Sequence, residues 1–387
     1  MDTTRRRRRA SRQIRRRRTF AAVGAIAVIA AIVTAIVVVP KLVAPATGEA
    51  VADGQPAPGA PSDSPTPTPT VALTAAQQLL AGSTDPAACA VTFTGDGISD
   101  QPVLQTEGGL YSDLPLPSAD GRVFAGWYTT SQDAAAFTTA QRVNESRTVS
   151  CTDRETTLFA SWKTPEENIA ENARIPILMY HQFTTNPAGE EGWLRGNYAY
   201  IGDFDAHMAY IASDGFYLPT WRELGAFIDG KVFLPNHSVI VTDDDADQTW
   251  FDLAAPVVEK YKVMTTSFMI TAWRQDAAPN PYVLRRSHTH DMHRAGDNGQ
   301  GRMVNLSADE IAADLETSAS VLGVKEVVAY PFGHYNDITK QGVAQAGFEM
   351  GRTIEPGYVS IGSDKLALPV QRVNYGMGLD ALVGMIG

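Results

Sequence analysis

Four aspartates stand within five positions of the sequence, at Asp243, Asp244, Asp245 and Asp247. They follow the apolar run 238–241 (SVIV), which has the length and composition of a buried strand. Neighbouring carboxylates repel one another unless water solvates them or a cation lies among them. The cluster therefore indicates either a solvated loop or a cation site at the end of a strand.

Five of the seven histidines also follow short apolar runs. His181 occurs in IPILMYHQF, His334 in VVAYPFGHYND, and His288, His290 and His293 in VLRRSHTHDMH. Imidazole and carboxylate groups are typical ligands of Zn²⁺. Two histidines and one aspartate would leave a coordination position open, as a catalytic zinc site requires. The pattern predicts a catalytic metal centre.

Strands and helices must alternate from about residue 175 onward to bring these segments together. Apolar runs of strand type are separated by helical stretches at 204–213, 249–261, 307–322 and 336–346. The third stretch begins with the capping box S-A-D-E, residues 307–310. Such alternation predicts a parallel sheet or an α/β barrel, in which reactive groups gather at the carboxyl ends of the strands.

Residues 174–375 resemble the NodB-type polysaccharide deacetylases, carbohydrate esterase family 4, and within them the branch that acts on poly-N-acetylglucosamine. LPNHSVIVTDDDA follows the family's L-P-x-x-S-V lead-in and TFDDG motif, with Asp243 in place of Phe and Ala246 in place of Gly. SHTHDMH matches that branch's S-H-T-x-x-x-H motif. The resemblance implies an α/β fold, a distorted (β/α) barrel of NodB type, over residues 166–387.

The resemblance also implies roles for single residues. Asp244 would be the general base and His181 the general acid, while the metal ligands would be Asp245, His288 and His293. A register shifted by one residue, with Asp243 as base and Asp244 as ligand, stays open. Zn²⁺ is the expected ion, and Co²⁺ or Ni²⁺ would suit the same ligands.

The segment YPFG matches the family's third motif, which shapes the substrate groove, and implies substrate contacts from Tyr330, Pro331 and Phe332. The family places an arginine, which orients the base, where this chain has Ala329. Because the branch carries an arginine near its C-terminal end, we expect Arg372 in LPVQRVNYG to take that role.

Two other polar residues near the motifs are expected to be structural. Asp247 is a short acid placed to cap the helix that starts near Thr249. His290 lies between the two histidines of the ligand motif and is expected to support the loop.

The implied reaction is hydrolysis of the N-acetyl groups of N-acetylglucosamine residues, in cell-surface polysaccharide or peptidoglycan, by metal-bound water. An O-acetyl esterase with the same site is one alternative, since an ester carbonyl reacts more easily than an amide. A non-catalytic surface protein that binds glycan or mediates adhesion is the other alternative.

The N-terminus predicts a membrane anchor. Ten arginines occur in the first 18 residues, so residues 1–19 form a basic tail, and residues 20–39 are uncharged. About 20 apolar residues suffice for a helix to cross a bilayer, and flanking arginines keep their side cytoplasmic. We expect a single-pass signal anchor at 20–39 with the catalytic domain outside the cell. A cleaved signal peptide, with the cleavage site near 44–46 (APA), is the rival interpretation.

The rest of the chain is acidic. Residues 41–387 keep 22 of the 32 Lys and Arg but 42 of the 43 Asp and Glu, a net charge of −20. Nucleic acid would repel such a surface, so we expect no nucleic-acid partner. Residues 40–74 hold the proline-rich run SPTPTPT and are expected to form an extended linker.

Residues 75–165 combine short alternating apolar runs with turn residues, which predicts a small β module. The segments VTFTGDG, GRVFAGWYTT and TLFASWK resemble the Listeria–Bacteroides repeat, or B-repeat, of bacterial surface proteins. That resemblance implies a β-grasp-like fold with a spacer or adhesion role. A disulfide between Cys89 and Cys151 is plausible in an extracellular module, and two unpaired buried thiols are the alternative.

Overall fold

A computed structural model of the chain describes residues 72–192, 194–273 and 280–387. The expected basic tail (1–19), the expected anchor (20–39) and nearly all of the expected linker (40–74) lie outside these ranges. Within the ranges, no helix combines the length and the apolar character that crossing a bilayer requires. Residues 70–387 cluster as one compact unit, which contains a small sheet and a barrel.

The small sheet has five strands in the order β2-β1-β5-β3-β4. The strands are β1 (Ala88–Thr94), β2 (Val103–Thr106), β3 (Val123–Tyr128), β4 (Arg142–Val143) and β5 (Glu155–Lys163). β1 and β5 pair in parallel at the centre, and the other pairs are antiparallel. Three short helices accompany the sheet, namely α2 (Ala75–Ala81), α3 (Ser131–Ala136) and α4 (Pro165–Ala170). The module is therefore mixed rather than all-β.

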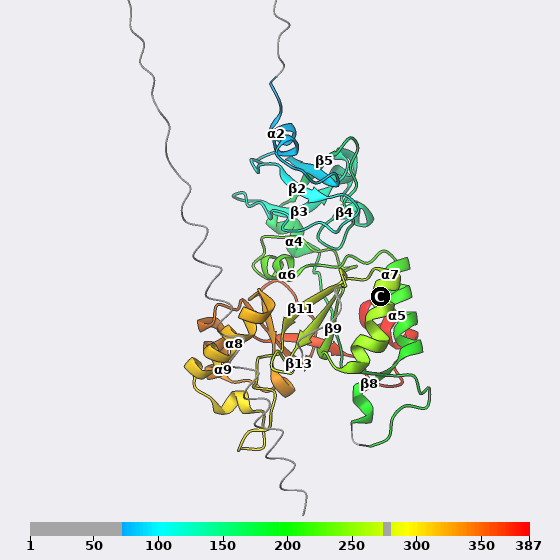
Figure 1. Cartoon of the computed structure of the whole chain (residues 1–387), viewed down its shortest axis with the longest axis vertical. Helices are drawn as coiled ribbons and strands as arrows, with labels where there is room; N and C mark the ends of the chain where they lie inside the picture. The colour runs from blue at the N-terminus through cyan, green and yellow to red at the C-terminus, as the bar shows by residue number, and fades with distance from the viewer. Residues whose placement is uncertain (1–71, 193, 274–279) are drawn as a thin grey trace, which may run out of the picture. The chain divides into compact units, whose positions relative to one another are not determined.

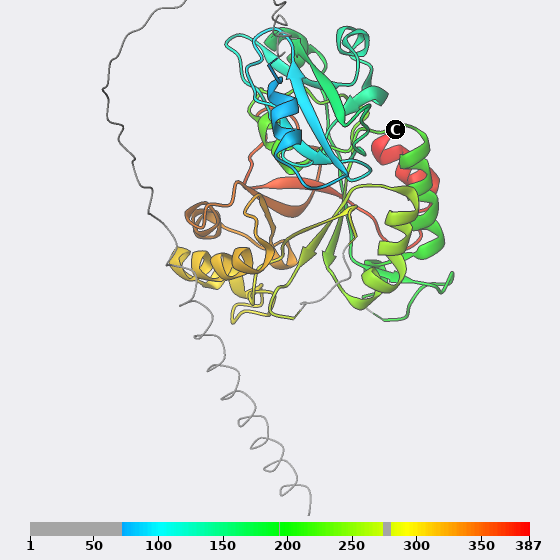
Figure 2. The ribbon, with the colours of Figure 1, turned by 45° about the horizontal axis from the view of Figure 1, so that its top comes forward.

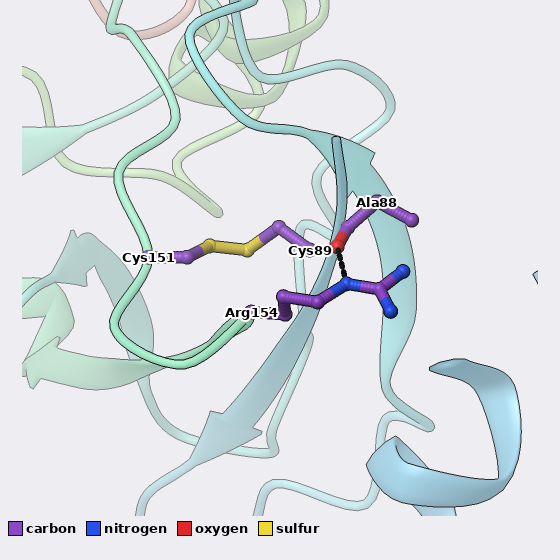
Figure 3. Close-up of a disulfide and its surroundings, with 4 residues drawn as sticks. All are labelled: Ala88, Cys89, Cys151 and Arg154. Carbon is purple, nitrogen blue, oxygen red and sulfur yellow. Dashed lines mark hydrogen bonds between the residues drawn. A yellow bond between two sulfur atoms is a disulfide. The ribbon is translucent and has the colours of Figure 1, made fainter. Parts of the chain in front are cut away.

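A disulfide joins Cys89 on β1 to Cys151, as Figure 3 shows, and confirms the predicted pair. The bridge closes a chain segment whose ends are 62 residues apart. Arg154 donates a hydrogen bond from Nε to the carbonyl oxygen of Ala88, 3.0 Å away, beside the bridge. Closing a loop of this length restricts the unfolded chain and stabilises the small module.

Seven parallel strands form the predicted barrel, closed in the order β10-β11-β12-β13-β14-β6-β9. Their bounds are β6 (Ile177–Tyr180), β9 (Ile240–Asp245), β10 (Thr265–Met269), β11 (Val283–Ser287), β12 (Val327–Ala329), β13 (Met350–Pro356) and β14 (Leu368–Arg372). A separate short pair, β7 (Gln182–Thr184) and β8 (Tyr198–Tyr200), lies between the first two barrel strands in the sequence. The register shifts once, between β13 and β14.

Helices surround the barrel. They are α5 (Ile201–Ser213), α6 (Trp221–Ile228), α7 (Ala255–Tyr261), α8 (Ala308–Leu322), α9 (Asp337–Gln345) and α10 (Leu379–Ile386). A π-helical turn (Trp250–Ala254) precedes α7, and three single 3₁₀ turns occupy Arg195–Asn197, Arg302–Asn305 and Pro331–Gly333. Figures 1 and 2 show α8 and α9 on one side of the barrel strands and α5 and α7 on the other. The predicted capping box begins α8, with the Ser307 hydroxyl and the Glu310 carboxylate bonded to each other's backbone N–H groups.

Successive residues of each barrel strand point alternately to the interior and to the helices. Ile240 on β9 belongs to the same core cluster as Ile177, Phe268 and Met350, which fills the barrel. Val241, the next residue, packs in the cluster beneath α5 and α7. This alternation decides where each polar residue at the strand ends points.

Candidate active site

The aspartates at the end of β9 occupy different environments because the strand alternates. Asp244 is an even number of positions from Ile240, so it points to the same side and lies at the top of the barrel interior. Asp243 is an even number of positions from Val241 and points to the helices. Asp245 and Ala246 both have positive φ, at 73° and 46°. Non-glycine residues avoid this left-handed region, so the turn is strained where the chain leaves the strand.

Asp245 faces two histidines of the SHTHDMH segment. Its Oδ1 lies 3.4 Å from Nε2 of His288 and 3.2 Å from Nε2 of His293. The potential ligand atoms of these three residues all lie within 4.8 Å of one another. Asp245 Oδ1 is buried and has no hydrogen-bond partner among the described residues. The structure thus brings the three predicted metal ligands together.

The protonation states of this group suit a divalent cation. Nδ1 of His288 lies 2.9 Å from the carbonyl oxygen of Ala329, and donation from Nδ1 leaves a lone pair on Nε2. Burial and then the neighbouring His288 lower the pKa of His293 to about 4. Burial would raise the pKa of Asp245, but the nearby imidazoles, His288 first and then His293, lower it overall. An ionised carboxylate and neutral imidazoles are the forms that bind Zn²⁺.

Asp244 lies between a buried arginine and the predicted general acid. The guanidinium of Arg352 donates from Nη2 to Asp244 Oδ1, and Nε2 of His181 lies 3.5 Å from Oδ2. Burial alone would raise the pKa of Asp244, but Arg352 and then His181 lower it below its ordinary value. Burial lowers the pKa of His181, while Asp244 and Asp245 oppose that shift. Asp244 is therefore an ionised carboxylate at neutral pH.

Arg372 does not have the partner that the sequence suggested. Its Nη2 donates to Asn197 Oδ1 at 2.6 Å and its Nε donates to Asn374 Oδ1 at 3.0 Å. The arginine that holds Asp244 is Arg352, the third residue of β13, whose side chain is fully buried. The prediction that Arg372 orients the base is wrong on this contact. Arg352 shares the parity of Met350, so a charged residue facing the core of an apolar strand was the available signal.

Asp243 points away from the site. Its carboxyl is fully buried on the helix side of β9, and Oδ2 accepts a hydrogen bond of 3.3 Å from Ser267 on the adjacent strand. Burial, with Asp244 next, raises the pKa of Asp243 well above its ordinary value. A neutral acid packed beneath the helices cannot act on a substrate in the barrel mouth. This geometry agrees with Asp244, and not Asp243, as the residue beside the ligand set.

Tyr330 and Pro331 do not line a groove. Tyr330 is fully buried, donates from its hydroxyl to the carbonyl oxygen of Leu366 at 2.9 Å, and stacks on Tyr335. Its position follows from alternation, since Ala329 faces the barrel and the next residue must face the helices. Gly351 is required next to it, because a Cβ there would collide with the Tyr330 hydroxyl.

Phe332 is the residue of this motif that reaches the surface. Its side chain is 42% exposed, and its ring centroid lies 4.3 Å from that of the metal-ligand candidate His293. Phe332 adopts a φ of 59°, which turns the chain away from the core directly after the buried Pro331. The predicted substrate contact is therefore retained for Phe332 alone.

The two residues expected to be structural have structural contacts. Asp247 Oδ1 accepts hydrogen bonds from the backbone N–H groups of Thr249 and Trp250, at 2.8 and 3.1 Å, and so caps the π-helical turn. His290 Nδ1 lies 3.0 Å from the hydroxyl of Thr271, and His290 is not a member of the ligand group Asp245, His288 and His293. The capping role of Asp247 is confirmed, and the supporting role of His290 stays a prediction.

Comparisons with known proteins agree with this geometry. Residues 232–351 match the family model described as Polysaccharide deacetylase. A poly-beta-1,6-N-acetyl-D-glucosamine N-deacetylase of Staphylococcus aureus (strain MRSA252) is 26% identical over 187 residues, which cover 43% of this chain and 64% of that relative. The Bacillus subtilis (strain 168) protein YxkH is 25% identical over 218 residues, covering 53% of this chain and 73% of that relative.

Among solved structures, the deacetylase PplD of Streptococcus pyogenes, in complex with acetate, aligns with a TM-score of 0.48 and 22% identity. The alignment covers 56% of this chain and 99% of that one. The family match spans β9, α7, β10, β11, α8, β12 and α9, and includes Asp244, Asp245, His288 and His293. Residues 232–351 of this chain therefore match an enzyme domain of the polysaccharide deacetylase type.

Proposed function

We propose that this protein removes N-acetyl groups from an N-acetylglucosamine-containing polysaccharide of the cell surface or cell wall. The observation that carries the proposal is the convergence of Asp245, His288 and His293 beside a separate ionised carboxylate, Asp244. The name of the Staphylococcus aureus relative supports an amide on poly-N-acetylglucosamine as the substrate. A bare ligand triad would serve many hydrolases, whereas the additional carboxylate–imidazole pair suits hydrolysis of an amide.

Asp245, His288 and His293 would hold a divalent ion, most simply Zn²⁺, with Co²⁺ or Ni²⁺ as substitutes. Bound there, the ion would polarise the acetamide carbonyl and lower the pKa of a coordinated water toward 7. Amides are poor electrophiles, so this activation is what an N-deacetylase needs.

Asp244 and His181 would move the two protons of the reaction. Asp244 is ionised and one of its oxygens is fixed by Arg352, so the other oxygen can accept the proton of the attacking water. His181, 14% exposed, would donate a proton to the departing amine. Its lowered pKa makes the protonated imidazole a stronger acid, while a smaller fraction of His181 is protonated at neutral pH.

The proposal is tested by acetate release from a poly-N-acetylglucosamine oligomer. We expect wild-type release to stop with a chelator and to return with added Zn²⁺. Asp244→Asn should lower kcat by about a hundredfold to ten-thousandfold, since it removes the proton acceptor and keeps the shape. Asp243→Asn is the matched control and should retain most of the activity.

The outcomes separate the candidate functions. Release from O-acetylated glycan alone would favour the esterase, and no release from either substrate would favour a binding protein. If Asp243→Asn abolishes release while Asp244→Asn keeps it, the shifted register is correct.

We further propose an extracellular, membrane-anchored location. The support is the sequence of residues 1–39, in which ten arginines precede an uncharged apolar segment. Expression with and without residues 1–39 tests it. The full chain should fractionate with membranes and be digested by protease added to intact cells, and the truncated chain should do neither.

A further inference from the structure

The loop that carries both candidate histidine ligands is held from outside by helix α8. Asp314 on α8 accepts two hydrogen bonds from consecutive backbone N–H groups of this loop. One oxygen accepts from His290 at 2.7 Å and the other accepts from Asp291 at 2.9 Å. Both amides lie between His288 and His293 in the sequence, so the Asp314 carboxylate binds the middle of the loop that carries the two histidines.

A second contact lies one turn further along the same helix. The buried hydroxyls of Ser318 and Ser287 are 2.8 Å apart, and the Ser287 hydroxyl also accepts from the backbone N–H of Thr289 at 3.0 Å. Positions 314 and 318 are four residues apart and therefore share one helix face. Helix α8 thus contacts the start and the middle of the loop with two polar side chains.

The loop needs such support because its backbone is strained. Thr289, the residue between the first ligand and the gripped amides, has a φ of 70° and is fully buried. A β-branched residue in this left-handed region costs on the order of 1–3 kcal/mol. The strained turn changes the direction of the chain directly after His288. This change of direction allows His293 to face the carboxylate of Asp245, as His288 does.

The segment that follows strand β10 supports the other edge of the loop. The backbone N–H groups of Thr271 and Ala272 donate to the carbonyl oxygens of Thr289 and His290, at 3.2 and 3.0 Å. The carbonyls are therefore bound on one side and the N–H groups on the other. Without Asp314, the amides of His290 and Asp291 would lose their acceptor, and the side of the loop facing α8 would be free to relax.

We infer that Asp314 is a positioning residue of the metal centre. Its carboxylate holds the strained turn in the one conformation in which the imidazoles of His288 and His293 both face Asp245. The inference rests on the proposed function, because it assigns Asp314 to the ion that the three residues would hold. Residues that orient metal ligands in this way typically affect metal affinity by about tenfold to a hundredfold.

The test measures Zn²⁺ affinity of the full chain by competition with a chromogenic chelator, without any substrate. Asp314→Ala should raise the dissociation constant about tenfold or more, and Asp314→Asn should raise it less, because an amide keeps one acceptor. The Co²⁺-substituted variants should show an altered visible absorption spectrum, since the ligand geometry changes. The matched control is Asp309→Asn, at an exposed aspartate of α8 that binds the side chain of Gln345, and its affinity should equal that of the wild type.

A thermal melt of each metal-free variant separates positioning from general weakening. A merely structural role would lower the metal-free Tm and leave the affinity and the Co²⁺ spectrum of the folded protein unchanged, which would overturn the inference. If wild type binds no Zn²⁺, both the metal centre and this inference fail. If Asp314→Ala loses Zn²⁺ while wild type releases no acetate, the inference stands and the proposed substrate is wrong.

Discussion

Asp243, Asp244 and Asp245 are consecutive in the sequence, yet each has a different partner. Asp243 meets Ser267 beneath the helices, Asp244 meets Arg352 in the barrel, and Asp245 faces two histidines. The motif alone located the three carboxylates and the histidines. It could not reveal Arg352, which is 108 residues from Asp244 and has no motif around it. The partner of a buried charge depends on which strands direct side chains toward one another inside the barrel. A local sequence pattern does not contain that information.

The contact between Arg352 and Asp244 leads to a prediction at the residue scale. Arg352→Met leaves the Asp244 carboxylate buried without its cation, which should lower the free energy of unfolding by about 3–5 kcal/mol. The freed carboxylate should also lose its orientation, so kcat should fall about a hundredfold. Denaturant unfolding and acetate release measure the two effects. Arg372→Met is the comparison, and a larger loss of kcat there would return the orienting role to Arg372.

At the scale of elements, the sequence predicted the positions of strands and helices more accurately than it predicted the directions in which single side chains point. The helical stretches expected at 204–213 and 307–322 correspond to α5 (Ile201–Ser213) and α8 (Ala308–Leu322). Tyr330, in contrast, was expected in the groove and is buried under α8 and α9. Three residues make up β12 (Val327–Ala329), too few for an alternating pattern to show which residue faces the helices.

Tyr330 and Phe332 are two residues apart and should respond differently to substitution. Tyr330→Phe removes one buried hydrogen bond to Leu366, which should cost about 1 kcal/mol of unfolding free energy and leave KM unchanged. Phe332→Ala removes an exposed ring beside His293 and should raise KM for the oligomer with little change in stability. Steady-state kinetics and thermal melts of both variants measure this contrast. A raised KM in Tyr330→Phe would place its hydroxyl at the substrate after all.

At the scale of the whole molecule, the small module and the barrel share a buried polar network. Arg142 of β4 donates to the carbonyl oxygen of Phe233 at 2.7 Å and pairs with Glu223 of α6 at 3.4 Å, and both charged side chains are almost fully buried. Asn144 donates to Glu223 as well, at 2.8 Å. A spacer role for the module would not require such contacts. They indicate that the two parts unfold together.

This network predicts one cooperative transition for residues 70–387. Arg142→Met leaves Glu223 buried without its cation, so it should lower the unfolding free energy by about 3–5 kcal/mol. For each protein, tryptophan fluorescence and far-ultraviolet circular dichroism should report the same unfolding midpoint, and that midpoint should be lower in the variant than in wild type. Two separate midpoints in the wild type would show that the module and the barrel unfold independently.

The same interface should make the stability of the protein depend on pH through Glu145. Burial raises the pKa of Glu145 from 4.5 to about 7, and the negative charge of Glu223 adds to this shift. Arg222, 3.5 Å away, opposes the shift. Between these two pH values the unfolded chain releases a proton that the folded protein keeps. The free energy of unfolding should therefore fall as the pH rises from about 4.5 to about 7.

Glu145→Gln removes this titration and should be more stable than wild type by roughly 1–2 kcal/mol at a pH of about 8, with little difference near pH 4.5. Denaturant unfolding at the two pH values measures the difference, and Glu191→Gln, at an exposed loop residue, should show none at either. An equal effect of Glu145→Gln at both pH values would mean that the pKa of Glu145 is the same in the folded and the unfolded chain. In that case the contact with Arg222 offsets the burial of the carboxyl between the module and the barrel.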